Sequence, residues 1–340
     1  MKKYLVGAFL FIALVMSGYG ITVQAQDNSA ETGNPGAFLI SPVTKEISIS
    51  PGQTIELSGE DAITVRNIRD QNSVAFIAIE DFTADNESGV PRLLAENEES
   101  PFSIKPFISI TDSVQFAPNE RVTVPLTISV PADAAPGAYY GLISFRTEPE
   151  LLENQNVLLT ATSGPLFLIT VTGELDRQFS IEDFGSAQVT EQDTLFNARS
   201  FFTGGKIGSK IRIANTGNTF IKPIGKIQIK NMFGTVVEEL EINQATPRGN
   251  ILPGTSRDFT NLLSDRFYFG RYTMEANVSI IEDGGTIVPV TASFIVLPLW
   301  IIAVIAIVAI GITIFVRFVV PRHDKKVISK QKSRFKKPRR

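Results

Sequence analysis

Cysteine is absent from this 340-residue chain, and histidine occurs once, as His323. Residues 1–322 therefore hold no Ser-His-Asp or Cys-His nucleophile system and no zinc site built on His or Cys ligands. A Gly-rich loop of the phosphate-binding type is also missing. We expect no catalytic residues, no cofactor and no enzyme activity. Without disulfides, each domain must be held by its core, which indicates domains of at least ~100 residues.

Long apolar runs are scarce, and the first of the two lies at the N-terminus. Lys2 and Lys3 precede an apolar stretch at 4–16, and Val-Gln-Ala at 23–25 is typical of a cleavage site. This order predicts a signal peptide over residues 1–25, cleaved after Ala25. Residues 26–36 (QDNSAETGNPG) show no periodicity and are interpreted as a linker.

The second apolar run covers residues 298–320 and predicts a single transmembrane helix, because 18 uncharged residues at 299–316 are enough to cross a bilayer core. Trp300 is expected at the outer membrane interface and Arg317 at the inner one. Residues 321–340 form a basic tail, which the positive-inside rule places in the cytoplasm. The chain is thus predicted to be a type I, single-pass protein of the plasma membrane with an extracellular ectodomain.

Positive charge is depleted between the two apolar runs. Residues 26–293 contain 19 of the 32 Lys and Arg but 34 of the 35 Asp and Glu, a formal charge of −15. A surface of this sign disfavours nucleic acid as a partner. The basic tail is interpreted as a contact for anionic lipid headgroups.

Helical periodicity is missing from residue 37 to about 296. Short segments in which apolar and polar residues alternate are separated there by turns. Pro-Gly pairs at 51–52, 136–137 and 253–254 predict type II turns, and Asp-Gly at 283–284 predicts a hairpin. This pattern predicts an all-β chain of two tandem immunoglobulin-like sandwiches, at 37–174 and 178–295, plus the C-terminal transmembrane helix.

An internal repeat supports two domains of the same fold. The strand that ends at Asn67 matches the strand that ends at Asn215. Pro118-Asn119 matches Pro253-Gly254, and each pair opens a strand. The spacing from Asn to Pro is longer in the first copy, which indicates an insertion, placed in the acidic stretch at 81–100.

Carboxylate and tyrosine side chains are the next candidates for sites. Asp81, Asp85 and Glu87 are weak candidates for an oxygen-ligand metal site such as calcium. Their spacing does not fit an EF-hand loop, and a solvated charged loop is the interpretation that we favour. Tyr139 and Tyr272 follow glycine at equivalent places and are expected to be structural, each hydroxyl holding a loop.

The neighbours Phe201 and Phe202 are expected to face opposite sides of a strand. Packing in a core or between domains is therefore predicted for at least one of these two rings.

The N-terminal unit resembles the peptidoglycan-binding domain of the WxL-interacting surface proteins of Gram-positive bacteria. The resemblance covers residues 38–173 and is carried by FLISPV at 38–43, ISPGQ at 49–53, FAPN at 116–119 and VPADAAPGAYYGLISF at 130–145. It implies an immunoglobulin-like fold, attachment to the cell wall through peptidoglycan, and a second domain that contacts protein partners. It carries over no binding residues, because the matching motifs are structural.

Three functions follow from these observations. The first is a non-enzymatic, membrane-anchored surface protein of a bacterial envelope that binds peptidoglycan, a surface protein or both, as in adhesion. The second is a structural scaffold or assembly chaperone that acts by β-strand addition. The third is a carboxylate-dependent glycan hydrolase, which needs two carboxylates about 5 to 10 Å apart in a cleft. The ligand-binding residues and the oligomeric state are not predicted.

Overall fold

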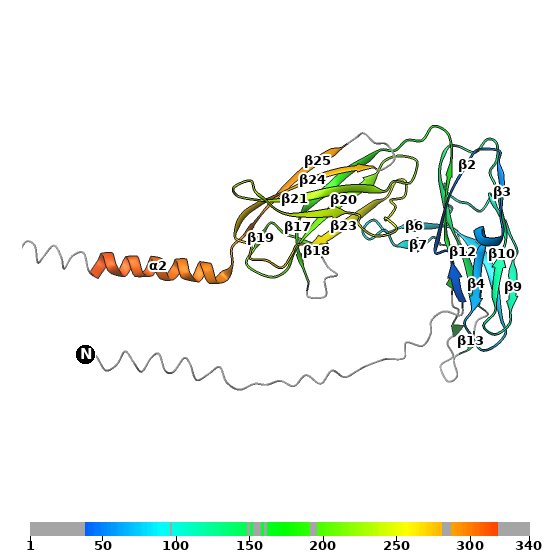
Figure 1. The fold of residues 1–340 in the computed structure, drawn as a ribbon, viewed down its shortest axis with the longest axis horizontal. Helices are drawn as coiled ribbons and strands as arrows, with labels where there is room; N and C mark the ends of the chain where they lie inside the picture. The colour runs from blue at the N-terminus through cyan, green and yellow to red at the C-terminus, as the bar shows by residue number, and fades with distance from the viewer. Residues whose placement is uncertain are drawn as a thin grey trace, which may run out of the picture.

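The computed structural model describes residues 38–95, 97–147, 150–151, 158–159, 162–190, 196–280 and 287–318. The predicted signal peptide, its cleavage after Ala25, the linker at 26–36 and the tail at 321–340 lie outside these residues. The predicted hairpin turn at 283–284 does too. Within the described part, the chain is all-β apart from one 3₁₀ turn, η1 (Gly59–Asp61), and one α-helix, α2 (Leu299–Phe318). Figure 1 shows two β-sandwiches side by side, with α2 projecting from the second.

The first sandwich is built from strands between residues 38 and 171. One layer has the order β2-β16-β12-β5-β9, with β15 paired to β12, and the facing layer consists of β1-β4-β10 and β3-β11-β8. Two small hairpins, β6-β7 and β13-β14, complete it. The strands are β1 (Phe38–Ser41), β2 (Thr44–Ile49), β3 (Thr54–Leu57), β4 (Ile63–Asn67), β5 (Ser73–Glu80), β6 (Phe82–Ala84), β7 (Pro91–Leu93), β8 (Ile108–Ile110), β9 (Ser113–Phe116), β10 (Arg121–Val124), β11 (Leu126–Ser129), β12 (Gly137–Thr147), β13 (Glu150–Leu151), β14 (Leu158–Leu159), β15 (Thr162–Ser163) and β16 (Leu166–Val171).

The second sandwich is built from strands between residues 179 and 296. Its layers have the orders β18-β17-β20-β23 and β19-β25-β24-β21-β22. The strands are β17 (Phe179–Val189), β18 (Phe196–Ala198), β19 (Phe201–Phe202), β20 (Ile207–Asn215), β21 (Pro223–Asn231), β22 (Val236–Ile242), β23 (Ser256–Leu262), β24 (Gly270–Ile280) and β25 (Val288–Val296). The proposed domain limits of 37–174 and 178–295 stay a prediction.

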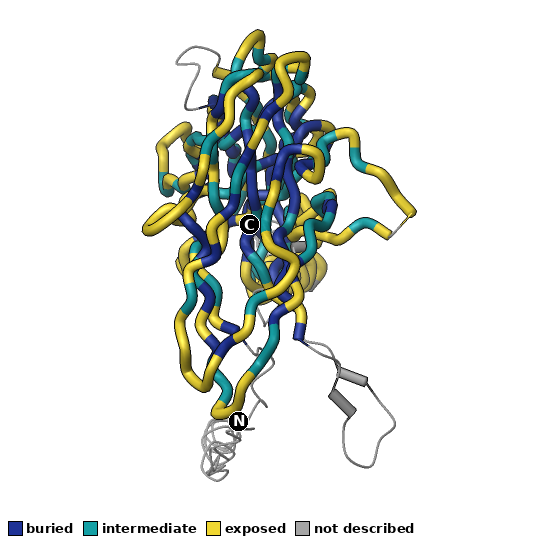
Figure 2. The backbone as a smooth tube through the Cα atoms, turned by 90° about the vertical axis from the view of Figure 1, so that its right-hand side faces the viewer, coloured by how far each residue is buried: buried dark blue, intermediate teal, exposed yellow. Residues whose placement is uncertain are grey.

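Alternation of apolar and polar residues produces both cores. In β24, every second residue from Tyr272 to Ile280 is buried between the layers. Figure 2 shows the buried residues gathered along the inner strands, with exposed residues along the outer loops. Each sandwich has its own large apolar cluster, which includes Phe145 and Phe167 in the first and Phe202 and Phe294 in the second.

The repeat seen in the sequence has a structural counterpart. Asn67 and Asn215 are buried at the ends of β4 and β20. The Nδ2 group of Asn67 donates to the backbone oxygens of Gln71 and Ala117. The Nδ2 group of Asn215 donates to those of Thr219 and Ile251. One buried amide thus fastens the same two loops in each sandwich.

The proline turns of the repeat also correspond. Asn119 and Gly254 both have a positive φ, of 59° and 70°. Gly52 likewise has a φ of 77°, as the Pro-Gly pair at 51–52 predicts. Gly137 differs from the prediction, because its φ is 150° and it begins β12 instead of closing a type II turn.

The prediction of a single membrane span at 298–320 is corrected by the structure. Helix α2 covers Leu299–Phe318 of the predicted span, and Arg317 lies in its last turn. Among the residues that the structure describes, no helix combines the length and the apolar character that crossing a membrane requires. This finding contradicts the predicted transmembrane segment and the type I localisation in the plasma membrane.

Candidate binding site between the two sandwiches

The two sandwiches meet through a small apolar cluster of their own. Phe82, Tyr140 and Leu168 of the first sandwich are buried there with Leu252 of the second, and Phe220 packs against them. The ring centroids of Tyr140 and Phe220 lie 6.0 Å apart. Burial, together with the nearby charge of Asp81, raises the pKa of Tyr140 to about 12.

A backbone seam runs beside this cluster. The amide of Ala138 donates to the carbonyl oxygen of Asn218 over 2.8 Å, and Asn218 Nδ2 donates to the carbonyl oxygen of Pro136 over 3.3 Å. A Cβ at Gly137 would stand 3.0 Å from the Asn218 oxygen, so glycine permits this approach. The start of β12 is thereby fixed to the second sandwich.

The hairpin β6-β7 forms a second bridge, and we call its tip, residues 85–89, the strap. The amide of Asp258 in β23 donates to the carbonyl oxygen of Glu87 over 2.7 Å. The Asp85 carboxylate shapes the strap by accepting from the Ser88 hydroxyl over 2.6 Å and from the Gly89 amide over 2.7 Å. These bonds, led by the one from Ser88, lower the pKa of Asp85. Figure 1 shows β6 and β7 extending toward the second sandwich.

An ion pair spans the opening between the sandwiches. Lys222 Nζ lies 2.7 Å from Glu46 Oε2, and Asn250 Nδ2 donates to Glu46 Oε1 over 3.0 Å. Partial burial alone would raise the pKa of Glu46, but the bonds from Lys222 and Asn250 outweigh it and the pKa is lowered. Glu46 therefore stays ionised to a lower pH than an ordinary glutamate does.

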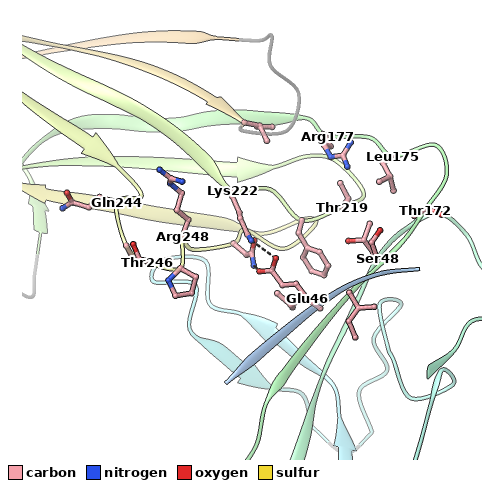
Figure 3. A pocket seen from close by; sticks show the side chains of 18 residues that line it. Glu46, Ser48, Thr172, Leu175, Arg177, Thr219, Lys222, Gln244, Thr246 and Arg248 are labelled. Atoms are coloured by element: carbon pink, nitrogen blue, oxygen red, sulfur yellow. Dashed lines mark hydrogen bonds and ion pairs between the residues drawn. The ribbon is translucent and has the colours of Figure 1, made fainter. Parts of the chain in front are cut away.

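A cleft of about 780 Å³ lies above this ion pair. One wall is the outer face of β2 and β16 with the segment that follows β16, and the other consists of loops of the second sandwich, as Figure 3 shows. The charged residues of the lining are three cations and one carboxylate: Arg177, Lys222, Arg248 and Glu46. Hydroxyl and amide side chains such as Ser48, Thr219 and Gln244 make up much of the rest.

The strand at the rim of this cleft has a free edge. β2 pairs in parallel with β16, and no described strand pairs on its other side. The carbonyls of Val43 and Ile49 accept from β16 and from the residue that follows it. Because backbone direction alternates along a strand, the N–H and C=O groups of Thr44, Glu46 and Ser48 point to the free edge.

Of the metal candidates from the sequence, Asp85 and Glu87 lie in the strap, and Asp81 directly precedes β6. Asp81 is buried, and one of its oxygens lies 2.8 Å from Lys105 Nζ. Asp85 shapes the strap, and Glu87 lies 4.0 Å from Arg212. Within the described residues, no group of three or more Asp, Glu, His or Cys is arranged to hold a metal ion.

The aromatic candidates are structural, as the sequence predicts. The Tyr139 hydroxyl donates to the Ala135 carbonyl oxygen over 3.1 Å, and the Tyr272 hydroxyl accepts from the Phe269 amide over 3.1 Å. Phe202 is fully buried, whereas Phe201 is 46% exposed, which confirms that the neighbours face opposite sides.

The two residues predicted at membrane interfaces lie at opposite ends of α2. The Trp300 ring lies 6.2 Å from that of Phe267, in the loop before β24. Arg317 is in the last turn of the helix.

Sequence reasoning missed the cleft residues. Glu46 and Lys222 are separated by 176 positions in the chain. No sequence pattern links a single Glu in a strand to a single Lys in a distant loop. The edge position of β2 was also hidden, because strand order depends on pairing between distant segments.

Comparison with known proteins gives a fold-level likeness only. No family model matches the chain, and no curated protein matches it. Among solved structures, it is similar to a chain of a chaperone–tip adhesin complex of CFA/I fimbriae biogenesis, with 12% identity, a TM-score of 0.37, and coverage of 76% of this chain and 99% of that one. It is also similar to the class 5 fimbriae chaperone CfaA, with 13% identity, a TM-score of 0.36 and the same coverage. The E. coli chaperone DraB matches at 12% identity with a TM-score of 0.33, over 76% of this chain and 96% of that one.

These findings correct the resemblance to the WxL-interacting surface proteins. No family model supports it, and the solved structures named above are of chaperones or a chaperone complex, two of them from fimbrial systems. The physical reason is that the matching motifs are turns and strand starts, such as the positive-φ turn at Gly52 and the opening of β12 at Gly137, which many sandwiches need. Membership of that family, peptidoglycan binding and a cell-wall role are withdrawn. At these TM-scores, the likeness does not indicate what the chain binds.

Proposed function

We propose that the chain is a non-enzymatic holder of other proteins, an assembly chaperone or scaffold, which takes up an extended segment of a surface protein along β2. The observation that carries this proposal is the free edge of β2 at the rim of the cleft. Thr44, Glu46 and Ser48 present their N–H and C=O groups there, and no described strand covers them. An added strand would satisfy these groups and gain affinity from main-chain hydrogen bonds.

The cleft supplies a means of selection beside the strand. Side chains of an added strand alternate between two faces. Those on the outer face would lie beside Glu46 and Ser48, which both line the cleft. There they would meet Arg248, the Phe220 ring and several hydroxyl groups. Backbone pairing would hold the partner, and the cleft would choose which side chains it accepts.

Hydrolysis of a glycan fits this site less well. Glycoside hydrolysis uses two carboxyl groups across the scissile bond. The described lining of the cleft has one carboxylate, Glu46, and this group is bonded to Lys222 and Asn250. Because these bonds lower its pKa, Glu46 is a poor proton donor, and the lining offers no second carboxylate to act with it.

The test is a photo-crosslinking side chain placed at the exposed Thr44, in cells that make the full chain. We expect an adduct with a secreted protein. Ser48→Pro should reduce its yield at least tenfold, because proline removes the outward N–H and is tolerated on an edge strand. Ser48→Ala keeps the N–H and is the matched control. A crosslinker at Asn277, exposed on β24, reports non-specific contacts.

Amide exchange separates strand addition from simple proximity. With the crosslinked partner bound, the Thr44, Glu46 and Ser48 amides should exchange more slowly, while the amides of β24, which pairs with β21 and β25, stay unchanged. An adduct that Ser48→Pro leaves at full yield would contradict pairing along β2, as would exchange at these three amides that the partner does not slow.

A further inference from the structure

The two sandwiches differ at one edge, and the internal repeat makes the difference visible. Counted from the equivalent prolines Pro118 and Pro253, Leu126 in β11 corresponds to Asn261 in β23. In the first sandwich, β11 is flanked by β3 on one side and β8 on the other. Leu126 lies opposite Ile110 of β8 and is buried.

In the second sandwich, the position that corresponds to β8 is empty of any described strand. β23 pairs with β20 alone. The Thr255 oxygen and the Leu263 amide bond to β20, so the backbone groups of even-numbered residues in β23 point outward. The strap covers the outward amides of Ser256 and Asp258.

Further along the same edge, the outward groups of Thr260 and Leu262 have no hydrogen-bond partner among the described residues. A cavity of about 500 Å³ lies beside them, between β23 and the edge strand β22. Leu262 is 38% exposed. The open edge, residues 260–262, is three residues long. The pairing between β8 and β11 in the first sandwich also covers three residues.

Asn261 is an independent sign that something is missing here. The residue is 9% exposed and lines the cavity, and its side chain makes no hydrogen bond within the described part of the chain. Its amide therefore leaves a donor and an acceptor open to a polar group that enters the cavity. The equivalent position in the complete sheet holds a leucine, so the amide is not a requirement of the fold.

The charge of the cavity indicates what could enter it. Its lining contains the carboxylates of Glu239 and Glu241 and no Lys or Arg. Lys226 Nζ lies 3.8 Å from Glu239 Oε2, the one ion pair of either carboxylate among the described residues. An extended segment with basic side chains would meet complementary charge along β22.

We propose that β23 accepts an extended, basic segment of a partner polypeptide as an additional strand, at the position that β8 occupies in the first sandwich. The incoming backbone pairs with Thr260 and Leu262. One of its polar groups bonds to Asn261, and its cations face Glu239 and Glu241. This site is separate from the edge of β2.

The experiment uses the full chain and two synthetic peptides. Each carries the β8 sequence Ile-Ser-Ile, flanked by two lysines on each side in one peptide and by two glutamates in the other. We expect the lysine peptide to bind at least tenfold more tightly than the glutamate peptide. The double variant Glu239→Gln/Glu241→Gln should abolish this preference.

Variants of the backbone edge locate the site. Thr260→Pro removes an outward amide and should abolish binding, whereas Thr260→Ser keeps the amide and should bind as the parent does. Ser48→Pro should leave binding of the lysine peptide unchanged, so failure here and failure at β2 are distinguishable. Slower amide exchange at Thr260 and Leu262 with the peptide gives the same information without a variant. Equal affinity for the two peptides, no binding, or loss of binding in Ser48→Pro would overturn the proposal.

Discussion

At the scale of single residues, Asn215 has the clearest predicted effect. Its Nδ2 group donates to the Thr219 and Ile251 oxygens over 2.7 and 2.9 Å, and its Oδ1 accepts from the Gly217 amide over 3.0 Å. Asn215→Ala would leave these buried groups without partners, so we expect a loss of about 3 kcal/mol in the free energy of unfolding. Urea denaturation measures it.

The exposed Asn277 provides the control for this substitution, since Asn277→Ala should change stability by less than about 0.5 kcal/mol. An equally small effect of Asn215→Ala would show that water replaces the lost bonds. The same measurement on Asn67→Ala tests whether the two halves of the repeat are also equivalent in energy.

The sequence predicts this residue pair because each asparagine ends an apolar strand at a similar place in its copy. The polar residues of the cleft give no comparable signal. Glu46, Lys222 and Asn250 come from different copies of the repeat. Their meeting depends on how one sandwich docks on the other, which local periodicity does not specify.

At the scale of elements, the strap joins β6-β7 of the first sandwich to an edge strand of the second. Gly89 in the strap has a φ of 71°, and a Cβ there would stand 2.8 Å from Arg257 Cδ. Arg257 is in turn bonded to the Asn250 oxygen over 3.1 Å. Gly89→Ala should therefore displace the strap, speed amide exchange at Asp258, and lower the stability by about 2 kcal/mol.

A second glycine separates backbone strain from this collision. Gly59 has a φ of 59°, and a Cβ there would meet no atom within 4 Å. Gly59→Ala should cost about 1 kcal/mol through its φ alone and leave exchange at Asp258 unchanged. If both variants exchanged alike at Asp258, the strap would not depend on the space that Gly89 leaves for Arg257.

The insertion that becomes the hairpin was predictable, but its role was not. The longer spacing in the first copy marks additional residues at 81–100, and the structure places β6 and β7 there. From the sequence alone, an acidic loop is interpreted as a solvent-exposed loop. The contact with β23 joins Glu87 to Asp258. These residues are far apart in the chain, so no local sequence pattern predicts the contact.

At the scale of the whole molecule, the apolar cluster between the sandwiches decides whether they behave as one unit. Phe220 packs there against Tyr140 of the first sandwich. Domains of one chain often move relative to each other because the interface between them is small, but an apolar interface resists this motion. We therefore expect the parent chain to unfold in a single calorimetric transition, with the seam and the strap supporting the cluster.

Phe220→Ala truncates the larger of the two side chains that the second sandwich contributes to this cluster, without entering either main core. We expect the coupling to weaken by about 2 kcal/mol and the single transition to split into two. Glu46 and Lys222 would then lose their fixed separation, and the cleft would lose one wall. Phe233→Ala, at an 85% exposed position on the β21-β22 turn, should leave one transition. Two transitions already present in the parent chain would contradict rigid docking. The cleft would then form only in part of the population, and binding along β2 would carry the free-energy cost of assembling it.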